Sequence, residues 1–145
     1  MIPRRPGAFL APAATGPPSP QSKMIIGMGA DFVRVDRIAR FVERAGEYGL
    51  ALVYTPYERT RLAGREFAAG RFAVKEALLK AAGLGFSQGV RRLAEIETVP
   101  TGTGAPEVRT SGSVRARLDE MGVKRVHVTI THEREHALAF VLLTG

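Results

Sequence analysis

Two stretches, GMGADFVRVDRI (Gly27–Ile38) and RFAVKEALLK (Arg71–Lys80), decide how this sequence is interpreted. The first begins as an apolar, glycine-punctuated strand and places Asp31 just after it. The second has the apolar spacing of a helix and carries Glu76, with Lys80 one turn later. Two carboxylates and a lysine suit the binding of a hard cation together with a phosphate group. Taken singly, each stretch has an ordinary explanation: Asp31 as a helix N-terminal carboxylate, and Glu76 with Lys80 as an exposed ion pair.

The composition is that of a globular protein of one domain, with 145 residues, 45% of them hydrophobic and 24% charged. The absence of Cys excludes disulfides, thiolate metal sites and a cysteine nucleophile, and it fits a cytoplasmic location. The net charge of +7 favours an acidic partner, whereas the lack of Trp and of an aromatic-and-basic pattern argues against nucleic acid. No apolar run approaches the roughly 20 residues that a membrane span needs.

The N-terminal segment differs from the rest in composition. Residues 1–23 are rich in Pro, Ala and Gly, and their prolines interrupt any apolar run of the length that a signal peptide needs. We expect a disordered extension over residues 1–23 and a single domain over residues 24–145. Met24 directly precedes an apolar strand, so the sequence leaves both Met1 and Met24 open as the start of translation.

Strand and helix signals follow one another without regular βαβ repetition, which predicts an α+β fold with an antiparallel sheet packed against helices. We expect strands at 24–28, 96–99, 107–110, 126–130 and 137–143, and helices at 35–45, 56–63, 65–82 and 113–121. Gly46 and Gly49 are expected to end the first helix. Thr55, Pro56 and Glu58 have the spacing of a capping box at the start of the second.

Two literal motif matches point to other functions, but their context disfavours both. GMGADF carries two glycines of the dinucleotide-binding fingerprint, yet Phe32 stands in the place of the third. His132–His136 reads HEREH, the signature of zinc proteases, but that signature requires a helix and these residues lie between two strand patterns. A zinc hydrolase using His132 and His136 therefore stays an alternative only.

The helix expected at 35–45 carries a basic stripe formed by Arg37, Arg40 and Arg44. Such a stripe is most often a solvated helix face. It is also suited to docking an acidic protein. A non-catalytic module that binds an acidic partner is therefore a second alternative to an enzyme.

In their order along the chain, the motifs resemble the holo-[acyl-carrier-protein] synthase family of 4′-phosphopantetheinyl transferases. The matching segments are GMGADFVRVDRI, VYTPYE, FAAGRFAVKEALLKAAGLG, GAPEVRTSG and VHVTITHEREHALA. The resemblance implies a small α+β subunit that forms a homotrimer with active sites at the subunit interfaces. It implies an enzyme that moves the phosphopantetheine arm of coenzyme A onto a serine of an acyl carrier protein, with Mg²⁺ as its cofactor. The carrier could serve fatty-acid or polyketide synthesis.

The resemblance also assigns roles within the candidate site. Asp31 and Glu76 would hold Mg²⁺, and Lys80 would contact the phosphate that is displaced. The nucleophile comes from the carrier protein, which agrees with the lack of an internal nucleophile motif. The base that takes the proton from the carrier serine stays open between Glu76 and a water molecule on the metal.

Other residues gain roles at the edges of that site. By the resemblance, Arg71 and His132 would lie near coenzyme A and reach the site of a neighbouring subunit. Arg37 would dock the acidic carrier protein, together with Arg40 and Arg44 on the same stripe.

Overall fold

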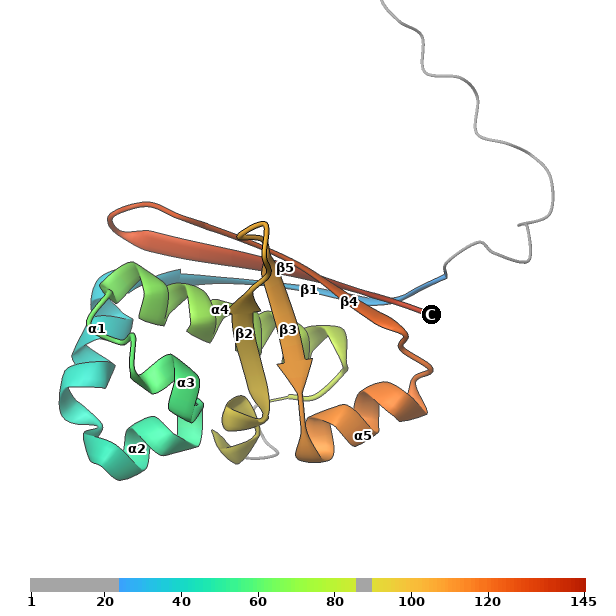
Figure 1. Ribbon diagram of the computed structural model, residues 1–145, viewed down its shortest axis with the longest axis horizontal. Coiled ribbons are helices and arrows are strands. Elements are labelled where there is room, and N and C mark those ends of the chain that lie inside the picture. Colours follow the sequence, from blue (N-terminus) through green and yellow to red (C-terminus); the bar gives the residue numbers. More distant parts are fainter. Residues whose placement is uncertain (1–23, 86–89) are drawn as a thin grey trace, which may run out of the picture.

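The computed structural model of the protein describes residues 24–85 and 90–145 (Figure 1). The strands are β1 (Ile25–Arg34), β2 (Ile96–Pro100), β3 (Pro106–Thr110), β4 (Arg125–His132) and β5 (His136–Thr144). The helices are α1 (Val35–Arg44), α2 (Gly46–Val53), α3 (Pro56–Arg59), α4 (Arg65–Ala81) and α5 (Gly112–Glu120), with a 3₁₀ segment, η2, at Val90–Glu95. The extension predicted over residues 1–23 lies outside the described residues.

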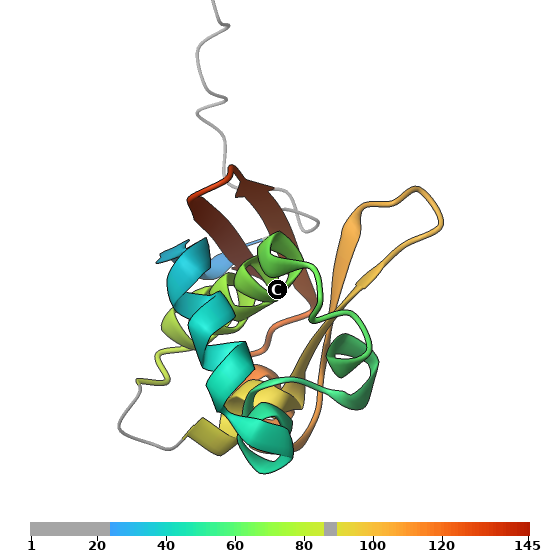
Figure 2. The ribbon, with the colours of Figure 1, turned by 90° about the vertical axis from the view of Figure 1, so that its left-hand side faces the viewer.

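The strands form two antiparallel units, a three-stranded sheet in the order β1-β5-β4 and a hairpin of β2 and β3. This confirms the expected α+β class. Figure 1 shows α4 running beneath the three-stranded sheet, with α2, α3 and α5 on the other side of α4. Figure 2 shows the β2–β3 hairpin projecting away from the body of the molecule. Within 24–85 and 90–145, no helix combines the length and apolarity that a membrane crossing requires.

Two glycines allow α4 to approach β1 closely. A Cβ atom at Gly29 would overlap the carbonyl oxygen of Ala77, and one at Gly27 would overlap that of Ala81. Alternate residues of a strand share one face, so both glycines and the following Asp31 face α4. The G-x-G motif is therefore a packing device, and it aligns Asp31 with the helix that carries the other candidate residues.

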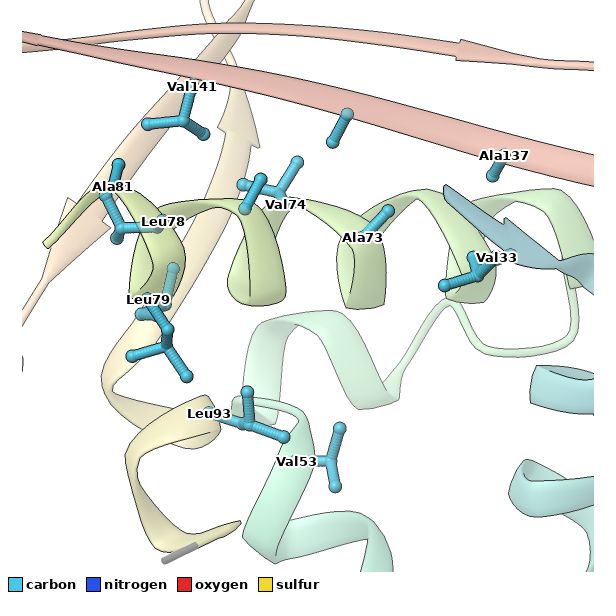
Figure 3. Close-up of a cluster of buried hydrophobic side chains, with 14 of the residues drawn as sticks. Val33, Val53, Ala73, Val74, Leu78, Leu79, Ala81, Leu93, Ala137 and Val141 are labelled. Carbon is cyan, nitrogen blue, oxygen red and sulfur yellow. The ribbon is translucent and has the colours of Figure 1, made fainter. Parts of the chain in front are cut away.

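The hydrophobic core lies on both sides of α4. Figure 3 shows Val141 and Ala137 of β5 on the sheet side of this helix, and Leu93 and Val53 on the other side. Leu78 of α4 is fully buried in this core. Burial of one such aliphatic side chain contributes about 1.5–3 kcal/mol, so this packing fixes α4 against the sheet.

Lys75 of α4 is fully buried. Its ammonium group forms a 2.8 Å ion pair with Glu58 of α3. It also donates hydrogen bonds to the main-chain oxygens of Leu93, at 3.0 Å, and Ile96. Burial lowers the pKa of Lys75, and the carboxylate of Glu58 opposes this change. No local sequence pattern predicts this pair, because 17 positions separate its two partners.

Glu58 also confirms the predicted capping box. Its side chain accepts a hydrogen bond from the backbone N–H of Thr55 at 3.1 Å, and the hydroxyl of Thr55 accepts one from the N–H of Glu58. The other carboxylate oxygen accepts a hydrogen bond from the N–H of Thr98 at 3.2 Å. The buried pair thus ties together α3, α4 and β2.

Three elements differ from expectation. Gly46 does not end the helical region, because its positive φ of 63° turns the chain into a further helix, α2. β1 continues to Arg34 rather than ending near Met28, since it stays paired with β5 as far as Arg34 opposite His136. The helix that begins at Pro56 is shorter than expected and ends at Arg59.

Candidate functional site

Asp31 lies within β1, where it pairs with Ala139 of β5, and not beyond the end of the strand. The interpretation of Asp31 as a helix N-terminal carboxylate is therefore wrong. The residue at the N-cap position of α1 is Arg34, and no side chain caps that helix. Asp31 is thus available for another role, and its side chain is 14% exposed at the margin between β1 and α4.

Lys80 joins α4 to β1. Its ammonium group lies 2.8 Å from Oδ1 of Asp31 and donates a hydrogen bond to the carbonyl oxygen of Ala30 at 3.0 Å. The exposed ion pair of Glu76 with Lys80, which is the ordinary explanation of their helical spacing, is not formed. Lys80 turns instead to the strand, because it shares the face of α4 that carries the small residues Ala77 and Ala81.

Glu76 is buried, with 5% of the residue exposed, which corrects the expectation of a solvent-facing side chain. Its Oε1 atom has no hydrogen-bond partner among the described residues. Burial raises the pKa of Glu76 from an ordinary 4.5 to about 7, and the negative charge of Asp31 adds to this shift. The positive charges of Lys80 and Arg37 oppose it. Asp31, Lys80 and Arg37 thus all act electrostatically on Glu76, and Lys80 is in direct contact with Asp31.

The donor set of this cluster fits a hard divalent cation. An unsatisfied buried carboxylate oxygen is costly unless a positive charge approaches it, and Asp31 supplies a second carboxylate nearby. Mg²⁺ in phosphate-binding sites is commonly held by one or two carboxylates, with the remaining ligands from substrate oxygens and water. No cluster of three or more His, Cys, Asp or Glu residues suited to a metal occurs among residues 24–85 and 90–145, so a cage made entirely of protein side chains is not formed there.

Arg71 does not join this cluster within one chain. Its guanidinium carbon lies 4.4 Å from the centroid of the Phe67 ring, and burial lowers its pKa while the charges of Glu58 and Tyr57 oppose that change. Five positions along α4 separate Arg71 from Glu76, so the two side chains leave the helix in different directions.

His132 is also apart from the cluster. It is exposed at the end of β4, where its register partner is Ala137. Together with Phe32 and His136, it lines a surface hollow of about 290 Å³. A role for Arg71 and His132 at a neighbouring subunit's site stays a prediction, because one chain does not test it.

The HEREH segment forms the turn between β4 and β5 and the ends of those strands, as its context predicted. His132 ends β4, whereas His136 begins β5 and stacks on Phe32 with ring centroids 4.6 Å apart. The helical arrangement that zinc proteases need is absent from this segment. The zinc hydrolase alternative therefore loses its structural basis.

The basic stripe lies on α1 as the helical spacing predicts. Arg37, Arg40 and Arg44 line one hollow of about 420 Å³, which Phe41 and Ala45 complete. Arg40 is paired with Asp36 at 3.0 Å. Arg37 and Arg44 form no ion pair in the described part of the chain, so their charges are available to a partner.

Comparison with known proteins agrees with this arrangement. Residues 27–141 match the family described as the 4′-phosphopantetheinyl transferase superfamily. A holo-[acyl-carrier-protein] synthase of Nitratidesulfovibrio vulgaris is 41% identical over 124 residues, which cover 83% of this chain and 98% of that protein.

Solved structures of holo-[acyl-carrier-protein] synthases superpose on this chain. The holo-[acyl-carrier-protein] synthase of Neisseria meningitidis superposes with a TM-score of 0.72 at 33% identity, covering 83% of this chain and 98% of that one. The synthase of Bacillus anthracis, solved in complex with CoA (3′,5′-ADP), gives a TM-score of 0.65 at 30% identity over 86% of this chain and 99% of that one. The chain therefore belongs to the holo-[acyl-carrier-protein] synthase family of the 4′-phosphopantetheinyl transferase superfamily.

Proposed function

We propose that this protein transfers the 4′-phosphopantetheine arm of coenzyme A to a serine of an apo acyl carrier protein and releases adenosine 3′,5′-bisphosphate. The observation that carries the proposal is the cluster of Asp31, Glu76 and Lys80, in which a buried carboxylate oxygen of Glu76 has no hydrogen-bond partner in residues 24–85 and 90–145. Membership of the synthase family supplies the reaction, and the coenzyme A complex of the Bacillus anthracis relative supports the choice of donor.

Asp31 and Glu76 would hold Mg²⁺ in this account. When bound, Mg²⁺ supplies positive charge to the oxygens of the coenzyme A pyrophosphate. The raised pKa of Glu76 supports this assignment, because a carboxyl with a pKa of about 7 is fully ionised at neutral pH only if a cation is bound beside it.

Lys80 would stabilise the negative charge that develops on the phosphate being displaced. Its ammonium group is half-exposed and is already held at the cluster by Asp31 and the Ala30 carbonyl. Glu76 is also a candidate to accept the proton of the carrier serine, alongside a water molecule.

A homotrimer would complete the site. The outer face of the three-stranded sheet exposes Met28 and Phe32, each with 62% of its surface accessible, beside partly buried Leu138 and Phe140. A continuous apolar face of this kind is typical of a protein–protein interface. Assembly through this face would cover it and would allow His132, at the same end of the sheet, to approach a neighbouring copy. Light scattering on the purified protein should give three times the mass of the chain, and Met28→Lys should lower it.

The hollow lined by Arg37, Arg40 and Arg44 would receive the acidic carrier protein. Arg37 also acts electrostatically on Glu76, so docking at this helix would place the carrier beside the cluster. Arg37→Glu should raise the KM for the carrier, and the increase should be largest at low salt. An unchanged KM would contradict docking at this position.

The reaction itself is tested by incubating the protein with coenzyme A, Mg²⁺ and apo carrier proteins of the fatty-acid and polyketide types. Intact mass spectrometry of each carrier measures the added arm. We expect conversion of at least one carrier, and EDTA should stop it. A carrier that keeps its apo mass under all conditions would contradict the proposed function.

A further inference from the structure

A second basic site lies at the junction of β3, α5 and β4. A cavity of about 350 Å³ opens there, and its volume is within the range of small-ligand sites, roughly 300–1,000 Å³. Figure 1 shows α5 next to the end of β3, with the chain leading from α5 into β4. The apolar residues that line the cavity include Leu118, which is buried, and Val108.

Four cationic residues, from three elements and a connection, line this cavity. Arg109 comes from β3, Arg115 from α5, Lys124 from the chain before β4, and Arg125 from β4 itself. The carboxylate among the lining residues is Asp119, so their formal charge is +3.

The ion pairs in this region leave much of the positive charge unneutralised. Arg115 uses its Nε to contact both oxygens of Asp119, at 3.0 and 3.1 Å, which leaves its terminal nitrogens available. Arg109 contacts Glu107 through its Nε at 3.2 Å. Lys124 and Arg125 form no ion pair with any residue in the described ranges. A ligand in the cavity would therefore meet cationic groups from several directions.

The cavity is separate from the transfer cluster. In the sheet register, Asp31 pairs with Ala139, which in turn pairs with Ile130 of β4. Arg125 lies five residues before Ile130 along the same strand, which corresponds to about 17 Å at 3.4 Å per residue.

We propose that the cavity between β3, α5 and β4 binds a small phosphate-bearing ligand through Arg109, Arg115, Lys124 and Arg125. A phosphate group carries up to two charges and several acceptor oxygens, and it accepts paired hydrogen bonds from guanidinium groups. Apolar lining residues such as Leu118 and Val108 would contact the less polar part of the ligand. The site is distinct from the one that would hold the coenzyme A pyrophosphate, and it does not depend on the proposed function.

The test measures binding of pyrophosphate to the full chain by calorimetry in EDTA at about 0.15 M salt. The cavity variant is Lys124→Gln/Arg125→Gln. The matched control is Arg65→Gln/Arg134→Gln, which removes the same charge from exposed positions elsewhere. We expect saturable binding with one equivalent per chain, at least tenfold weaker in the cavity variant and within twofold of wild type in the control. Amide shifts of Val108 and Val126 should report the same titration.

Three results would overturn the proposal. Wild-type protein could show no saturable binding. The two double variants could lose affinity equally, which would mean a non-specific response to net charge. Binding could also disappear in Lys80→Ala while surviving in the cavity variant, which would place the pyrophosphate in the transfer cluster instead.

Discussion

Lys80 of α4 forms a 2.8 Å ion pair with Asp31 of β1, although 49 positions separate the two residues. Because the lysine turns to the strand, Glu76 on the preceding turn keeps a buried oxygen without a hydrogen-bond partner in the described structure. The close approach of α4 to the glycines of β1 brings these three side chains together. The arrangement leaves a negative centre that a cation would neutralise.

Glu76→Gln should stabilise the metal-free protein at alkaline pH. A carboxyl whose pKa is higher in the folded state than in the unfolded chain binds its proton more tightly when folded, so wild-type stability falls as pH rises from about 4.5 to about 7. The glutamine variant lacks this loss. Urea unfolding in EDTA measures the free energy of unfolding of both proteins. Relative to wild type, Glu76→Gln should gain about 1 kcal/mol more at pH 8 than at pH 5, after allowance for screening by solvent. A gain that does not depend on pH would contradict the raised pKa.

Mg²⁺ should raise the melting temperature of the wild-type protein, since a ligand that binds only the folded state stabilises it. Asp31→Asn and Glu76→Gln should each abolish this increase because each removes a charged ligand. Thermal unfolding with and without Mg²⁺ gives the melting temperature of each protein. The exposed carboxylate variant Glu120→Gln is the control and should respond as wild type does. If Mg²⁺ still raises the melting temperature of both Asp31→Asn and Glu76→Gln, the cation binds elsewhere.

Lys75→Met should lower the free energy of unfolding by about 3–5 kcal/mol, because it leaves the buried carboxylate of Glu58 unpaired. In Lys75→Met/Glu58→Gln the buried charge is gone, so much of the loss should be recovered. Chemical denaturation of both variants compares them with wild type. If the double variant is no more stable than the single one, the unpaired charge is not the cause of the loss.

Gly29→Ala should destabilise the protein by at least about 2 kcal/mol, because the new Cβ would overlap the main-chain oxygen of Ala77. This oxygen belongs to the backbone of α4 and cannot rotate away as the end of a side chain could. Gly102→Ala is the matched control, since no atom lies within 4 Å of the added Cβ there. Both free energies of unfolding come from the same denaturant titration. Equal stabilities of the two variants would contradict the close packing of α4 on β1.

Much of the fold could be predicted from local signals. The capping box at Thr55, the length of α4 and the terminal hairpin each depend on residues close in sequence, and the structure confirms them. The buried pair of Glu58 and Lys75 could not be predicted, because its partners meet only after α3 has packed against α4.

The candidate site was predicted in part. Family order along the sequence predicts roles for Asp31, Glu76 and Lys80, and those roles stay a prediction. Helical spacing alone favours a pair of Glu76 with Lys80, whereas Lys80 pairs with Asp31 in the structure. The small residues Ala77 and Ala81 would have indicated which face of α4 meets the glycines of β1. The proposed homotrimer would bring chains together without any local sequence signal, so the role predicted for Arg71 depends on that proposed assembly.

The most direct test of the account is the Mg²⁺-dependent transfer of the phosphopantetheine arm by wild-type protein and by Glu76→Gln, followed by the intact mass of the carrier. Circular dichroism should first show that the variant is folded. The account predicts full conversion by wild-type protein with Mg²⁺ and loss of at least about 100-fold in rate for Glu76→Gln, because a charged ligand of the cation is gone. Transfer by Glu76→Gln at the wild-type rate would contradict the assignment of the Asp31–Glu76–Lys80 cluster as the transfer site.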